Sequence, residues 1–168
     1  MHSSQSTTSP SPRPHRPPSE RVHRLIHKRS FATLATSSPA GRPHVAGVLY
    51  QRVDDALYVS TLRSSRKARN IAANPAVAVS IAVRRVPVGP PSTIQFQAEA
   101  DILAPDDPHI VELASGGNID SITGHGELEL PDGCFLRIPV GNRLVTYGIG
   151  MPLRTLISDP MGAGGIAA

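Results

Sequence analysis

Residues 41–70 read GRPHVAGVLYQRVDDALYVSTLRSSRKARN, and the rest of the chain can be understood from this stretch outward. Two β-like runs, Pro43–Tyr50 and Ala56–Thr61, are joined by a turn through Asp54 and Asp55. Residues 61–69 are basic and rich in hydroxyls where a helix is predicted to begin. A helix start favours anions, and basic side chains there add charge-assisted hydrogen bonds. The pattern indicates either a phosphate site or a solvated basic helix start.

Hydrophobic periodicity and turn residues predict the other elements. Helices are expected at Arg21–Lys28, Ser65–Ala73, Asp106–Ser115 and Pro152–Ser158. Strands are expected at Ser30–Ser37, Pro43–Tyr50, Ala56–Thr61, Ala76–Val83, Ser92–Ala104, Cys134–Val140 and Arg143–Ile149. The last two strands are expected to form a hairpin around Gly141 and Asn142. Arg84–Pro91 and Gly116–Gly133 are predicted to be loops, and the second is long for a compact domain.

The order of these elements favours a mainly β protein with short helices. Strands and helices do not alternate as in a Rossmann sheet, and neither a dinucleotide fingerprint nor a phosphate-loop motif occurs. A closed antiparallel barrel of six to seven strands fits better. We expect one domain at residues 21–160, between a disordered tail rich in Pro, Ser and Arg at 1–20 and a flexible C-terminus at 161–168.

The net charge of +4 arises from the N-terminal segment. Residues 1–30 carry six of the seventeen Lys and Arg residues and only one acid, Glu20. The remaining chain is near neutral, and its aromatic content of 4% with no Trp offers few surfaces for stacking on bases. The composition therefore argues against a nucleic-acid-binding domain.

One cysteine, Cys134, cannot form a disulfide within the chain, which suits the cytoplasm, and it is expected to be a small core residue. No apolar run reaches the ~20 residues of a membrane span, and no signal-peptide core is present. His23 and His27 are four residues apart, but no third ligand completes a metal site, so no metal is predicted.

Phe31–Ile81 resembles the flavin-binding split-barrel family typified by pyridoxamine 5′-phosphate oxidase. The resemblance lies in FATLATSSPAGRPHVAGVLY and ALYVSTLRSSRKARNIAANPAVAVSI. In order, these contain a strand, Gly-x-Pro-His at the start of the next strand, a third strand ending in a hydroxyl pair, Ser-Arg-Lys opening a helix, Asn-Pro ending it, and a fourth strand. The resemblance implies a split barrel that pairs as a homodimer, with the cofactor at the interface.

The resemblance also implies a set of cofactor-binding positions. The strand along the ring would hold Pro43, His44, Val45, Ala46, Gly47 and Val48. The hydroxyl pair Ser60 and Thr61 would lie near the ribityl chain, and Ser65, Arg66 and Lys67 would bind the phosphate. A partner-subunit Gln often approaches the ring in this family; here that position is nearer Thr93, with Gln95 two residues on.

Two departures point away from a true pyridoxamine-phosphate oxidase. Pro43 stands where those enzymes often have Arg, and their C-terminal ending with Trp and Arg is absent from residues 150–168. The sequence looks closer to actinobacterial oxidoreductases that use a flavin or the deazaflavin F420. The resemblance implies hydride transfer between FMN or F420 and a small organic substrate.

Alternatives to this enzyme remain. A non-catalytic flavin- or F420-binding protein and a haem-binding protein can share the fold. No catalytic acid or base is assigned. His125 and Tyr147 are candidates for substrate contact or proton delivery, or are structural residues, and a base must first lie within reach of a substrate.

Overall fold

The computed structural model describes residues 19–84 and 92–167. Its strands are β1 Phe31–Ser37, β2 Pro43–Leu49, β3 Gln51–Val53, β4 Ala56–Leu62, β5 Ala76–Val83, β6 Ser92–Glu99, β7 Asp101–Leu103, β8 Gly133–Pro139, β9 Leu144–Tyr147 and β10 Gly164–Ala167. Its α-helices are α1 Ser19–His27, α2 Arg66–Ala73, α3 Pro108–Ser115 and α4 Leu153–Ser158, and its 3-10 helices are η1 Asp120–Ile122, η2 Glu127–Glu129 and η3 Met161–Ala163. The predicted tail, up to residue 18, and most of the predicted loop at 84–91 lie outside the described residues.

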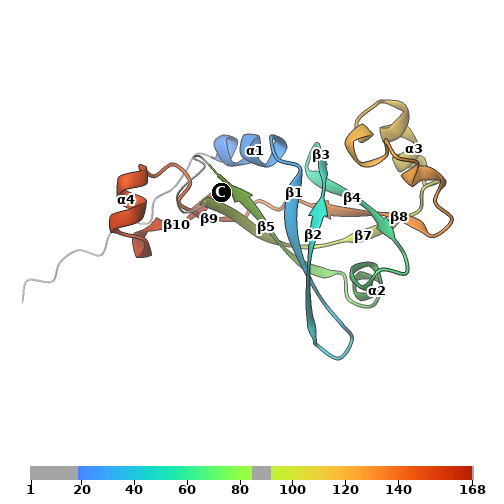
Figure 1. The fold of residues 1–168 in the computed structure, drawn as a ribbon, viewed down its shortest axis with the longest axis horizontal. Coiled ribbons are helices and arrows are strands. Elements are labelled where there is room, and N and C mark those ends of the chain that lie inside the picture. The colour runs from blue at the N-terminus through green and yellow to red at the C-terminus, as the bar shows by residue number, and fades with distance from the viewer. Residues whose placement is uncertain (1–18, 85–91, 168) are drawn as a thin grey trace, which may run out of the picture.

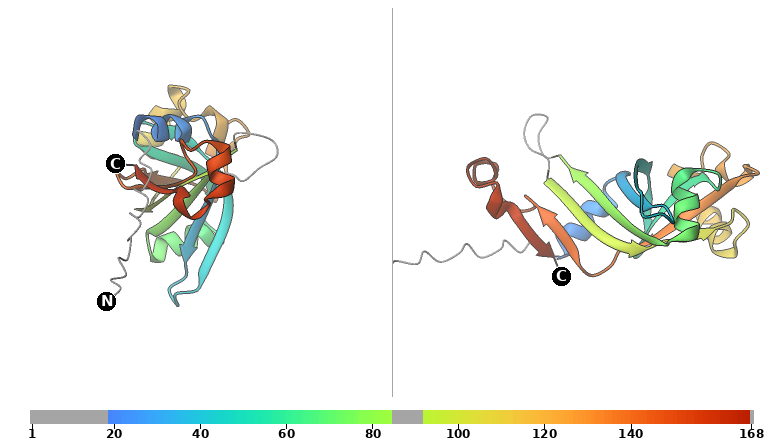
Figure 2. Two further views of the ribbon diagram at one scale, coloured as in Figure 1. Left: turned by 90° about the vertical axis from the view of Figure 1, so that its left-hand side faces the viewer. Right: turned by 90° about the horizontal axis from the view of Figure 1, so that it is seen from below.

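The strands form two antiparallel sheets, which confirms the mainly β split-barrel prediction. One sheet has the order β10-β9-β6-β5-β1-β2 and the other has the order β3-β4-β8-β7. The two sheets and the helices around them are shown in Figures 1 and 2. The described residues contain more strands than the six to seven predicted, because Ala100 divides one predicted strand into β6 and β7, while β3 and β10 were not expected.

The core lies between the two sheets. The large sheet contributes alternate residues such as Leu34, Val79 and Ile81, and the small sheet contributes Leu57 and Leu136. In β5 the large residues point inward, while Ala76, Ala78, Ser80 and Ala82 lie on the less buried face. An apolar run of this kind suits a strand buried on both faces, but the small residues of β5 line an open sheet face.

The predicted hairpin around Gly141 and Asn142 is wrong. β8 pairs with β4 and β7 in the small sheet, whereas β9 pairs with β6 and β10 in the large sheet. The segment between β8 and β9 is therefore a corner between sheets. Local turn chemistry could not show this, because the partners of both strands lie far away in the sequence.

The C-terminal residues also differ from the expectation of a flexible end. Gly164–Ala167 pairs with β9, and Ala163 packs with Met151 and Leu156 in a small apolar cluster. α4 lies beside β10 and β9 at this edge of the large sheet (Figure 1) and contributes Leu156 to the cluster. The glycine-rich composition suggested fraying, but pairing with β9 orders the backbone.

The helices α1 and α2 fix the ends of β2. Val22 and Ile26 of α1 are fully buried, and the Ile26 carbonyl accepts a hydrogen bond of 2.7 Å from the Tyr50 hydroxyl. The α2 helix is capped by Ser65, where Ser65 Oγ accepts the Ala68 N–H, and at its other end by Asn74. Between α1 and α2, the chain forms β1 and β2 of the large sheet and then passes into the small sheet as β3 and β4.

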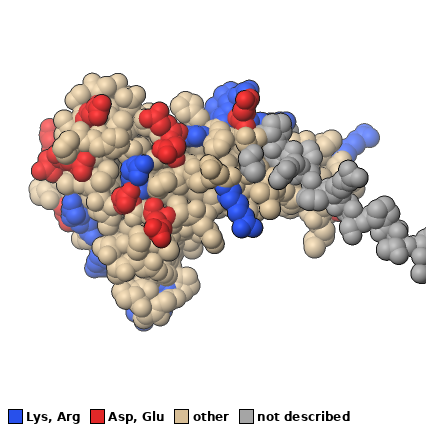
Figure 3. Space-filling model, turned by 180° about the vertical axis from the view of Figure 1, so that it is seen from behind, with Lys and Arg blue, Asp and Glu red and all other residues tan. Residues whose placement is uncertain are grey.

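Charge is distributed unevenly over the surface. On the face shown in Figure 3, basic and acidic side chains are interspersed and form no continuous basic surface. Acidic groups gather toward the end of the molecule that carries α3 and the loop after it. None of the helices in the described ranges is long and apolar enough to cross a membrane.

Candidate functional site

A cavity of about 380 Å³ opens where β2 and β4 meet the start of α2, and we call it the strand-end cavity. Its walls come from four regions, which are β2, β4, α2 and the segment between α3 and β8: Gly47, Val48, Leu49, Val59, Ser60, Thr61, Leu62, Lys67, Ser121, Ile122, His125, Glu127 and Leu130. Five of the predicted site residues, Gly47, Val48, Ser60, Thr61 and Lys67, therefore meet in one place. The volume and the mixture of apolar walls with a few polar groups are typical of a small-molecule site.

The start of α2 supplies hydrogen-bond donors to this cavity. Ser65 caps the helix and also accepts a 3.4 Å hydrogen bond from the Thr61 hydroxyl. Within the described residues, the backbone N–H groups of Arg66 and Lys67 have no acceptor. Together with the half-buried Lys67 ammonium, they form a set of donors suited to a phosphate.

The approach to α2 is held in place by Asp132. Its carboxylate accepts the Ser64 N–H at 3.1 Å, and its carbonyl accepts the Arg63 N–H at 2.8 Å. The hydrogen bonds from Ser64 lower the pKa of Asp132 below its usual value, so the carboxylate keeps its charge. The loop that precedes the helix is thereby tied to the start of β8.

The loop between α3 and β8 forms the outer wall of the cavity. Ser121 donates its backbone N–H and its hydroxyl to Gln51 Oε1, which ties the loop to β3. Glu127 accepts the His125 N–H at 2.8 Å, and this hydrogen bond is the main reason that the Glu127 pKa lies below its usual value. The His125 ring stays 89% exposed, 3.7 Å from the Glu127 carboxylate. His125 thus stands at the cavity mouth, as a candidate for substrate contact.

A second hollow of about 520 Å³ lies on the other side of the α2 start, and we call it the arginine pocket. It is lined by Ser38, Arg42, Pro43, His44, Arg66, Arg69 and Asn70. Three predicted residues, Pro43, His44 and Arg66, line this pocket and not the strand-end cavity. Arg42 and Arg69 were missed, although the spacing of Arg69 three residues after Arg66 places both on one helix face.

The other predicted positions lie elsewhere. Val45 and Ala46 lie on β2 between the two hollows, and Val45 is exposed. Thr93 is on β6, which β5 and β1 separate from β2 in the sheet, so it does not reach the strand-end cavity of its own chain. Tyr147 pairs with Thr93 in register and packs on the C-terminal apolar cluster.

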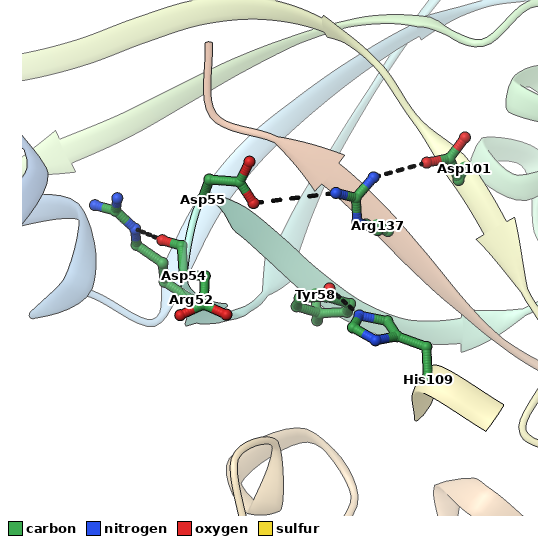
Figure 4. A network of polar contacts seen from close by, with 7 residues as sticks. All are labelled: Arg52, Asp54, Asp55, Tyr58, Asp101, His109 and Arg137. Carbon is green, nitrogen blue, oxygen red and sulfur yellow. Dashed lines mark hydrogen bonds and ion pairs between the residues drawn. The ribbon is translucent and has the colours of Figure 1, made fainter. Parts of the chain in front are cut away.

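A separate polar network lies on the small sheet (Figure 4). The Tyr58 hydroxyl is 2.6 Å from His109 Nε2, and Arg137 contacts Asp101 at 3.2 Å and Asp55 at 4.0 Å. Burial raises the pKa of Tyr58, which keeps its hydroxyl protonated as a donor. These residues do not line either hollow, so we assign the network to holding α3 against the small sheet and β7 beside β8.

Cys134 is buried opposite Thr61, in β8, and burial raises the pKa of its thiol. It is therefore a core residue, as predicted. Across residues 19–84 and 92–167, no group of three or more His, Cys, Asp or Glu side chains is placed to hold a metal ion.

Comparisons with known proteins agree with this architecture. Among solved structures, the heme storage protein HutZ from Vibrio cholerae is 21% identical, with a TM-score of 0.62 over 74% of this chain and 91% of that chain. A heme binding protein from Mycobacterium smegmatis is 18% identical, with a TM-score of 0.67 over 82% of this chain and 57% of that one. A protein described as F420 reductase is 22% identical, with a TM-score of 0.51 over 70% of this chain and 90% of that chain. At these identities, the likenesses show the fold alone.

No curated protein matches the chain. The sequence profile of a family described as pyridoxamine 5′-phosphate oxidase matches residues 18–137, which include β1 to β7, α2, α3 and most of β8. The match also includes both hollows described above. The chain therefore belongs to the pyridoxamine 5′-phosphate oxidase family.

Proposed function

We propose that this protein is a flavin- or deazaflavin-dependent oxidoreductase that binds FMN or F420 in the strand-end cavity. The observation that carries the proposal is the meeting of Lys67 and the Ser60–Thr61 hydroxyl pair in one cavity beside β2, next to the start of α2, where the N–H groups of Arg66 and Lys67 have no acceptor among the described residues. A phosphate would be held at Lys67, and the ring would lie along the backbone of β2. We keep Ser65 in the site as the cap that orients these donors.

When bound, the cofactor supplies hydride transfer to or from an organic substrate. The chain binds and orients it. Apolar walls at Val48, Val59 and Ile122 exclude water from one side of the cavity, while the Thr61 hydroxyl and Lys67 provide polar contacts. His125, held beside Glu127, is the titratable group nearest the open side and could exchange a proton with a substrate.

A homodimer is part of this proposal. The outer face of the large sheet exposes apolar side chains along its whole width: Phe31, Val45, Leu49, Val145 and Ile166 are between 41% and 61% exposed. The same face has a hollow of about 720 Å³ with Gln95 and Arg143 in its lining. A second copy covering this face would bury these side chains and could place its Gln95 or Thr93 near the cavity of the first.

We also propose a cytoplasmic location, because the single thiol of the chain is unpaired.

The test is a titration of purified, ligand-stripped protein with FMN and, separately, with F420, followed by cofactor fluorescence. Multiple-turnover assays with the preferred cofactor in its reduced form, using quinone and nitro compounds as acceptors, then test for catalysis. Saturable binding with turnover supports the oxidoreductase. Saturable binding without any turnover supports a non-catalytic cofactor-binding protein.

Haem binding is a second candidate. His125 is the one histidine that lines the strand-end cavity within the described residues, and it stands at the mouth with its ring exposed. Its imidazole could serve as an axial ligand. Titration with haemin, followed by the absorbance of the haem band in wild type and in His125→Ala, tests this candidate. A band that is absent in the wild type would exclude it.

A further inference from the structure

The arginine pocket lies between two rigid walls. Asn70 is buried and donates a 2.9 Å hydrogen bond from Nδ2 to Thr36 Oγ1, which holds α2 against β1. On the other wall, Ser38 and Arg42 close the β1–β2 turn through hydrogen bonds of 2.9 and 3.1 Å. Both walls are therefore fixed before any ligand arrives, which lowers the entropic cost of binding.

The pocket concentrates positive charge without a counter-charge. Arg42, Arg66 and Arg69 line it together with His44, and no carboxylate is part of the lining. Within the described residues, none of these four side chains forms an ion pair or a side-chain hydrogen bond. By contrast, Arg137 is flanked by Asp55 and Asp101. Guanidinium groups that face one hollow without acids repel one another and favour an anion between them.

The pocket is separate from the phosphate donors of the strand-end cavity. Successive residues of a helix point about 100° apart, so Lys67 faces the strand-end cavity while Arg66 and Arg69 face the arginine pocket. Along β2, the distance from Gly47 to Pro43 is about 13 Å at roughly 3.3 Å per residue. The start of α2 borders both hollows, so a ligand whose ring lies beside Gly47–Leu49 and whose first phosphate lies at Lys67 can extend past this helix start into the arginine pocket.

We propose that the arginine pocket binds a second anionic group of the same ligand, beyond the phosphate held at Lys67. The proposal rests on the proposed function and names the ligand class more narrowly: cofactors whose chain continues past the first phosphate into a further phosphate or carboxylates. The second phosphate of FAD and the carboxylates of F420 both present two oxygens that can accept paired hydrogen bonds from one guanidinium group. FMN has no such group, so it gains no affinity from the pocket.

The experiment measures the affinities of FMN, FAD and F420 for stripped wild type and for the double variant Arg42→Ala/Arg69→Ala, at one fixed ionic strength. Both side chains are exposed, so the fold is expected to tolerate the change. Arg66 is left in place because it adjoins Lys67. Arg154→Ala, an exposed arginine on α4 remote from both hollows, controls for the loss of positive charge.

We expect the affinity for FMN to change less than about two-fold. The affinity for FAD or F420 should fall roughly ten- to a hundred-fold, which is the effect of losing charge-assisted hydrogen bonds. A loss confined to FAD identifies a diphosphate ligand, and a loss confined to F420 identifies a carboxylate ligand. Equal losses for all three cofactors, or no loss for any, would overturn the inference while leaving the cofactor cavity intact. A wild type that binds none of the three would instead refute the proposed function, and the inference with it.

Discussion

The strand-end cavity and the arginine pocket share two elements, β2 and α2, yet their chemistry differs. The first has one lysine, one histidine, one glutamate, hydroxyls and apolar walls; the second has three arginines and a histidine without an acid. The difference arises from helix geometry, because Arg66 and Lys67 are neighbours in sequence but point in different directions. A basic pair in a sequence is therefore not necessarily one binding site, and the two hollows can be altered independently.

The largest effect is expected from Lys67→Ala, which removes the cation of the strand-end cavity. A charge-assisted hydrogen bond to phosphate contributes about 1.5–3 kcal/mol, so FMN affinity should fall roughly ten- to a hundred-fold. Riboflavin, which lacks the phosphate, should bind both proteins equally. Fluorescence titrations with the two ligands measure this, with Lys28→Ala, an exposed lysine just after α1, as the matched control. Unchanged FMN affinity would place the phosphate elsewhere.

Tyr50→Phe should lower the stability of the fold without changing ligand binding in either hollow. It removes the hydroxyl that donates to the Ile26 carbonyl, which then keeps only the 3.2 Å hydrogen bond from the Arg29 N–H, at a cost of about 1 kcal/mol in the free energy of unfolding. Denaturant unfolding at pH 7 measures the cost, and FMN affinity should not change. An altered affinity with unaltered stability would contradict the structural role of Tyr50.

The effect of Tyr50 should also depend on pH. Burial raises the pKa of Tyr50 well above its ordinary value of 10.0, so the folded protein holds this proton more tightly than the unfolded chain does. The stabilising effect of the tyrosine is therefore complete below pH 10 and is lost as the pH rises above it. The stability difference between wild type and Tyr50→Phe should shrink in alkaline buffer; a difference that grows there would reverse the sign and refute this account.

Thr36→Val should affect the arginine pocket more than the cavity. It removes the acceptor of the Asn70 amide and leaves a buried donor unpaired, at about 1 kcal/mol of stability. Since Asn70 lines the pocket and orients α2, affinity for a cofactor with two anionic groups should fall by a few fold, and that for FMN by less. Thr155→Val, on α4, is a control at a distant site. Equal losses for both kinds of cofactor would show that the hydrogen bond supports the whole of α2.

The smallest effect on cofactor affinity is expected from His125→Ala. Its ring is 89% exposed at the cavity mouth, so FMN affinity should change less than about two-fold. Turnover, if it depends on proton exchange at this ring, should fall while the Michaelis constant for the cofactor stays the same. A large loss of FMN affinity would mean that His125 contacts the cofactor itself.

The sequence predicted the local elements well because their signals are local. The start of α2 at Ser65, the turn at Asp54 and the strand that begins at Ser92 each follow from neighbouring residues, and the structure confirms them. The assembly of Gly47, Ser60 and Lys67 was predicted only through family resemblance, since no local pattern shows that β2 and β4 end beside α2.

What the sequence did not predict depends on distant pairing. The residues after Pro139 join the two sheets instead of forming a hairpin, and β10 is ordered only by β9. The division of Arg66 and Lys67 between two hollows requires the position of the β1–β2 turn, which brings Arg42 to the helix. Such features depend on tertiary packing, and residue propensities carry no information about them.

The central claim is that the strand-end cavity binds a flavin or deazaflavin through a phosphate at Lys67. Its most direct test is the titration of stripped wild type and Lys67→Ala with FMN and F420, with haemin as a competitor, followed by cofactor fluorescence. We predict saturable binding of at least one of the two cofactors by the wild type and a loss of at least ten-fold in the variant. Binding of haemin alone, or cofactor binding that Lys67→Ala leaves unchanged, would contradict the claim.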